Sequence, residues 1–106
     1  MADHHVTQTL DGTEALVRAY AELIRSGQPP IIDDTPLADN VYAEDRTDDG
    51  RLQLMLAGGG PTVYLVYDPG TGAAELLGIG WGEPVHRADD PQKSLATFAA
   101  AYTSSR

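Results

Sequence analysis

Cysteine is missing from the 106-residue sequence, and so are long apolar runs and any concentration of positive charge. Without thiols the chain cannot form disulfides, thiolate metal sites, iron–sulfur clusters or a cysteine nucleophile. The longest apolar runs, such as residues 63–67, are far shorter than the roughly 20 residues that span a bilayer. The first residues also lack the basic and apolar regions of a signal peptide. We therefore expect a cytoplasmic protein without a membrane segment.

Positive charge is scarce, with 7 basic residues against 16 acidic ones and a formal net charge of −9. Direct binding to nucleic acids or to anionic lipid requires clustered Lys and Arg, so this balance opposes both. The length fits one domain over residues 1–106. For a chain of this mass, folding reduces the accessible surface from roughly 16,000 to roughly 6,000 Å², which allows a thin hydrophobic core.

The N-terminal third predicts a short strand followed by a helix. Residues 3–10 suit a strand through their β-branched content. Asp11 and Glu14 have the spacing of a capping box, which predicts that a helix begins there. Apolar residues then recur at helical spacing up to Ile24. Gly27 predicts the C-terminal cap, and the prolines after it prevent the helix from continuing.

The middle of the chain predicts an irregular connection over residues 31–40 and then an antiparallel meander. Two strands, 41–46 and 51–57, flank an Asp-Gly turn, which is typical of a hairpin. The strongest strand, 62–67, is rich in β-branched and aromatic residues. A strand over 73–79 returns after the turn at 68–72.

A second helix begins near Asp90, which suits an N-cap with Pro91 at the first helical position. The order is strand, helix, meander, helix, which predicts an α+β fold. We expect a mainly antiparallel sheet of four to five strands with two amphipathic helices on one face. The expected core comprises Leu16, Val17, Tyr20, Leu23, Ile24, Leu54, Leu65, Leu95 and Phe98.

Motifs for catalysis or ligand binding fail on inspection. The glycines at 58–60 precede a strand, whereas a phosphate-binding loop precedes a helix. Residues 45–50 resemble the opening of a calcium-binding EF-hand loop, but the position of its last ligand holds Leu56. No serine lies in a nucleophile elbow. We expect no catalytic, cofactor-binding or metal-binding residues and no enzymatic activity.

Acidic residues gather between positions 33 and 49, a segment with Arg46 as its one basic residue. One interpretation is solubility and protection of a sheet edge. A second is an electronegative face that docks on a basic protein, and metal binding is a third. Trp81, between two glycines, is either a core residue or an interface anchor. Tyr64 and Tyr67 point to opposite faces of their strand, so one of them is a further candidate anchor. The expected partner-binding set is Asp33, Asp34, Glu44, Asp45, Asp48, Asp49 and Trp81.

Residues 52–55, the segment Val-Tyr-Leu-Val-Tyr-Asp at 63–68, Gly78 and the segment Trp-Gly-Glu-Pro-Val at 81–85 resemble small immunity proteins of high-GC bacteria, especially the Imm1 type. The helix over residues 14–24 occupies a similar place. The resemblance covers about half the chain. It implies an acidic α+β protein that binds a secreted, nucleic-acid-targeting toxin, often a deaminase, and blocks its active site. The chain departs from that family in ending with a helix directly after the meander, so no family residues are carried over.

The leading hypothesis is therefore an acidic inhibitor that binds and blocks a basic, nucleic-acid-targeting protein such as a secreted deaminase or nuclease toxin. A phage-encoded inhibitor of a CRISPR complex is one alternative. A small ligand-binding domain or enzyme with an unrecognised site is the other. The neighbouring genes discriminate among the three.

Overall fold

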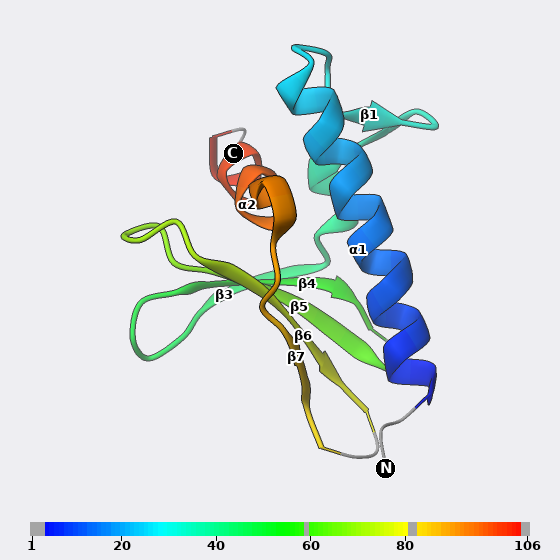
Figure 1. The fold of residues 1–106 in the computed structure, drawn as a ribbon, viewed down its shortest axis with the longest axis vertical. Helices are drawn as coiled ribbons and strands as arrows, with labels where there is room; N and C mark the ends of the chain where they lie inside the picture. Colours follow the sequence, from blue (N-terminus) through cyan, green and yellow to red (C-terminus); the bar gives the residue numbers. More distant parts are fainter. Residues whose placement is uncertain (1–3, 59, 81–82, 105–106) are drawn as a thin grey trace.

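The computed structural model describes residues 4–58, 60–80 and 83–104 (Figure 1). Its longest element is α1 (His4–Arg25), so the strand expected over residues 3–10 is wrong. Val6 and Leu10 lie four residues apart and are both buried, which is the spacing of one helical face. The β-branched residues of this segment suggested a strand, but the helical spacing of its apolar residues decides its conformation. Among the described residues, no helix has both the length and the apolar character to cross a membrane.

The predicted end of α1 is confirmed. Gly27 adopts a φ of 75°, and the Gln28 amide donates to the Leu23 carbonyl at 2.9 Å. These features close the last turn, as expected of a glycine C-cap. The predicted capping box is wrong, because Asp11 and Glu14 lie inside the helix.

The connection after α1 contains a minimal hairpin of β1 (Ile31–Ile32) and β2 (Thr35–Pro36), followed by the short helix η1 (Leu37–Asn40). Asp33 and Asp34 form its turn with φ values of 50° and 63°. Two successive positive φ values match the twist of a two-residue hairpin. Tyr20 of α1 donates its hydroxyl proton to the Thr35 carbonyl at 2.7 Å, which fixes the hairpin against the helix.

The main sheet is a five-stranded antiparallel meander with the order β3-β4-β5-β6-β7. Its strands are β3 (Ala43–Arg46), β4 (Leu52–Ala57), β5 (Thr62–Tyr67), β6 (Ala74–Ile79) and β7 (Val85–Arg87). The α+β class and the antiparallel meander are confirmed. The fifth strand is β7, the last strand of the meander, and not the N-terminal segment.

The last helix, α2 (Ser94–Ser104), follows a short turn, η2 (Pro91–Lys93). Gln92 and Lys93 have positive φ values of 58° and 56°, so the chain changes direction between the two elements. The Asp90 carboxylate accepts hydrogen bonds from the backbone amides of Leu95 at 2.7 Å and Ala96 at 3.3 Å. The Asp90 side chain therefore caps α2, but Asp90 is not at the N-cap position, because Pro91 opens the short turn and the α-helix begins at Ser94.

Both helices pack on one face of the sheet and contact each other (Figure 1). Of the expected core residues, six are buried, and Leu23 and Ile24 are partly buried. Leu16 is 36% exposed, so its assignment to the core is wrong. The buried stripe of α1 runs through Val6, Leu10, Val17 and Tyr20, and Leu16 lies beside it. The confirmed core residues are Val17, Tyr20, Leu54, Leu65, Leu95 and Phe98.

An ionic cluster joins the edge strand β7 to α1. Arg87 donates to Asp11 Oδ1 at 2.7 Å and to Glu14 Oε1 at 3.0 Å. The hydrogen bond with Asp11 is the main cause of an Arg87 pKa raised above its ordinary value. The spacing of the two acidic residues places them on one helical face. They therefore hold the sheet edge against the helix.

Candidate functional site

One face of the five-stranded sheet carries neither helix, and we call it the open face. Leu54, Leu65 and Leu76 are paired across β4, β5 and β6, and all three are buried against the helices. Side chains alternate along a strand, so the residues next to these leucines point to the open face. Strand pairing aligns them in two rows. One row is Ala43, Met55, Tyr64, Leu77 and His86, and the other is Asp45, Gln53, Val66 and Glu75.

The acidic residues of β3 and the β3–β4 turn, which we call the acidic hairpin, lie at one edge of the sheet. They are Glu44, Asp45, Asp48 and Asp49. All four residues of β3 are exposed. Glu44 turns toward the helices, because the Tyr102 hydroxyl of α2 donates to its carboxylate at 3.0 Å. Asp45 points to the open face and accepts a hydrogen bond from the Arg46 amide at 2.8 Å. The adjacent carboxylates of Glu44 and Asp45 therefore point to opposite faces of the sheet.

Asp48 and Asp49 differ in their surroundings although both lie in the exposed β3–β4 turn. Asp49 accepts a hydrogen bond from the Thr47 hydroxyl and forms an ion pair with Arg51, with Nε and Oδ2 3.0 Å apart. The Thr47 hydrogen bond is the largest cause of an Asp49 pKa below its ordinary value, followed by the hydrogen bond with Arg51. Asp48 is exposed and has no ionic partner in the part of the chain that the structure describes. The Asp49 carboxylate is thus engaged by neighbouring residues of the turn, whereas the Asp48 carboxylate is open to a partner.

This difference predicts a pH-dependent effect of Asp49→Asn on stability. A lowered folded-state pKa stabilises the fold above the unfolded-state pKa of about 3.9, and the contribution disappears as the pH falls through the folded-state value. We expect Asp49→Asn to be less stable than wild type at neutral pH, with the difference shrinking in acid. Chemical denaturation over a pH series measures it. Asp48→Asn is the matched control and should leave stability unchanged, and an equal effect of both changes would contradict the assignment.

The structure does not bring all six predicted acidic residues together. Asp33 and Asp34 occupy the tip of the β1–β2 hairpin, which projects on the far side of α1 from the β3–β4 turn (Figure 1). The hairpin is tied to α1 through Tyr20, whereas β3 extends along the opposite edge of the sheet. The six acidic residues are close in sequence but form two separate groups in the structure. Trp81, the predicted anchor, lies outside the described residues.

Sequence reasoning missed Tyr42. It directly precedes β3 and is 70% exposed, more than the other large hydrophobic residues described as exposed. It lines an apolar hollow of about 330 Å³ together with Met55, Leu56, Ala57 and Gly58. Its one sequence signal is its position beside the acidic segment. Tyr64 faces the open side while Tyr67 packs against the core, which confirms the predicted alternation.

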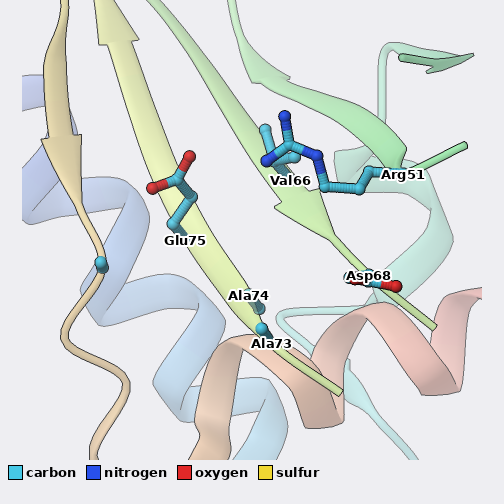
Figure 2. Close-up of a pocket in the computed structure, with 7 residues that line it drawn as sticks. Arg51, Val66, Asp68, Ala73, Ala74 and Glu75 are labelled. Carbon is cyan, nitrogen blue, oxygen red and sulfur yellow. The ribbon is translucent and has the colours of Figure 1, made fainter. Parts of the chain in front are cut away.

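A second hollow, of about 310 Å³, lies at the opposite end of the open face (Figure 2). Figure 2 shows Arg51 reaching toward Val66, while Glu75 on β6 and Asp68 directly after β5 line other parts of the hollow. Val66 is only 5% exposed although no helix covers it, and the side chain of Arg51 lines the same hollow. Glu75 also lies 3.4 Å from His86 Nδ1. The hollow therefore offers charges of both signs, which suits polar contacts at the rim of an interface.

Among the described residues, no group of three His, Asp or Glu side chains is arranged to hold a metal ion. Comparison with protein-family models, with curated proteins and with solved structures finds no match.

Proposed function

We propose that the chain is an acidic inhibitor that binds and blocks a basic, nucleic-acid-targeting protein, as an immunity protein does when it neutralises a secreted deaminase or nuclease toxin. The observation that carries this proposal is the acidic hairpin. Its strand is fully exposed at a sheet edge, and Asp45 and Asp48 project from it without an ion pair among the described residues. The net charge of −9 and the resemblance to immunity proteins add support.

The mechanism follows from the charge of the partner. A protein that acts on nucleic acid presents Lys and Arg to the phosphate backbone. Carboxylates of the acidic hairpin occupy the same positive field, so they accelerate association and orient the encounter. The bound inhibitor then excludes the nucleic acid from the basic surface by its bulk and its charge. Catalysis by the inhibitor plays no part in this block.

Neutralising Asp45 and Asp48 tests the proposal. We expect Asp45→Asn with Asp48→Asn to slow association about three- to tenfold at low salt and to flatten its salt dependence, with a smaller change in dissociation. The partner is recovered with the wild-type chain as bait from cells that encode it, and the neighbouring genes are read alongside. Stopped-flow kinetics with the purified partner measure both rates. Asparagine at position 45 still accepts the Arg46 amide hydrogen bond, so the fold is retained.

The matched control is Asp33→Asn with Asp34→Asn. It removes the same charge from the other acidic group, and asparagine tolerates the positive φ of that turn. We expect it to change association less than the hairpin pair does. Equal association rates for wild type and the hairpin pair would refute the steering role. A recovered partner that is not basic would refute the proposed function itself.

A further inference from the structure

The open face has an apolar half that no element of the described chain covers. Met55, Tyr64 and Leu77 are direct neighbours across β4, β5 and β6. Ile79 continues the same face of β6 and is 39% exposed, and Tyr42 borders Met55 at the sheet edge. We call Tyr42, Met55, Tyr64, Leu77 and Ile79 the apolar row. Contiguous exposed apolar surface with a polar rim is typical of protein interaction sites.

The rim of this row is charged. Asp45 and Glu75 lie two residues along their strands from Ala43 and Leu77, and they face the same side. Acidic groups beside exposed aromatic and aliphatic side chains fit a surface with the complementary arrangement, in which apolar side chains are flanked by Lys or Arg. A second copy of this chain does not fit, because each copy carries a net charge of −9 and would oppose carboxylates with carboxylates.

We infer that the apolar row is the docking face for the basic protein partner, with an apolar side chain of the partner seated in the hollow between Tyr42 and Met55. This inference rests on the proposed function. It adds that the affinity for the partner arises at the apolar row. The hollow has a volume of about 330 Å³ and is lined by side chains of the sheet edge and by Gly58. Buried aromatic contacts at the centre of an interface dominate the dissociation rate, whereas rim charges act on association. The acidic hairpin then attracts the partner and the apolar row retains it.

Site-specific photocrosslinking in the cells that encode the protein tests the docking face. Benzoylphenylalanine replaces Leu77 on the open face, or Tyr42 in the hollow beside Met55. Leu16, a similarly apolar and exposed residue on α1, is the matched control position. We expect crosslinks from positions 42 and 77, and not from 16, to a basic protein. The crosslinked peptide should contain Lys or Arg beside the apolar residue that reacted. Crosslinks from position 16 alone, to a second copy of the chain, or at no position would overturn the inference.

The purified crosslinked partner allows the kinetic test. We expect Tyr42→Ala to raise the dissociation rate about tenfold or more and to leave association nearly unchanged. Its side chain is largely exposed, so the truncation does not threaten the fold. Leu16→Ala should change neither rate. If the acidic hairpin controls association with a basic partner that crosslinks only from position 16, the inference fails and the proposed function stands. An open-face partner without basic character would instead refute the proposed function.

Discussion

Leu65→Ala should lower the free energy of unfolding by about 2–5 kcal/mol, the largest single effect that we expect in this protein. Leu65 has no exposed surface and lies in β5, the central strand of the sheet. Its partners across the sheet, Leu54 and Leu76, are equally inaccessible, and α2 packs above the strand. Truncation therefore removes apolar contacts and leaves a cavity that rigid neighbours cannot fill. Chemical denaturation monitored by circular dichroism measures the loss.

The control is Leu77→Ala, the same truncation on the opposite face of the adjacent strand. Leu77 is only partly buried and borders solvent, so its loss leaves no closed cavity. We expect a cost of about 1 kcal/mol or less. Hydrogen exchange adds a second measurement, since the amides of β5 should be among the slowest to exchange. Similar costs for the two leucines, or fast exchange throughout β5, would contradict the placement of the core.

Four of the five strands of the sheet were predictable because their signals are local, whereas the short strand β7 was not predicted. The turn residues around Gly50 and the alternation of Leu52, Leu54 and Leu56 determine both the hairpin and the buried face. β5 matches its predicted bounds, because six residues of strong β propensity lie between clear turn signals. The acidic hairpin follows from the same features, since an edge strand with charged side chains remains exposed.

The start of the first helix was not predicted, because the β-branched residues of the N-terminal segment suggested a strand and outweighed the helical spacing of Val6 and Leu10. Val6 and Leu10 begin a stripe that continues to Tyr20, and the acidic pair Asp11 and Glu14 suggested that the helix starts later. Their partner, Arg87, lies more than 70 residues further along the chain. The acidic pair of a capping box and an acidic pair that binds a distant arginine from within a helix have the same spacing in sequence, and tertiary contact alone distinguishes them.

The candidate site was also only partly predictable from the sequence, because its arrangement depends on tertiary structure. Sequence proximity grouped Asp33 and Asp34 with the acidic hairpin, but β2 and η1, which lie between them, carry the chain across the molecule (Figure 1). The apolar row is a property of strand register, since it joins residues from three strands. Alternation predicted that one tyrosine of β5 faces away from the core. The neighbours of that tyrosine became known only with the pairing of the strands.

Gly78→Ala should destabilise the fold by about 1–3 kcal/mol, although it adds a single methyl group. Gly78 lies buried in β6 where α1 crosses the sheet. A Cβ atom there would lie 2.7 Å from Val6 Cγ1, 2.9 Å from Leu10 Cδ1 and 3.0 Å from Leu10 Cγ. Both side chains are fully buried, so they cannot swing into solvent, and the helix must move away from the strand. Glycine at this position is therefore required by close packing, as is common for glycines within strands.

Two further variants separate this packing effect from a general intolerance of alanine. Gly12→Ala, in an exposed part of α1 where a Cβ atom meets nothing within 4 Å, should stabilise the fold by about 0.5–1 kcal/mol through helix propensity. The two changes are chemically identical and have opposite expected signs. In a double-mutant cycle, Val6→Ala should cost less in the Gly78→Ala background than in wild type, because it removes the atom that makes the closest contact. Additive effects in that cycle, or a stable Gly78→Ala protein, would show that α1 does not approach β6 through this glycine.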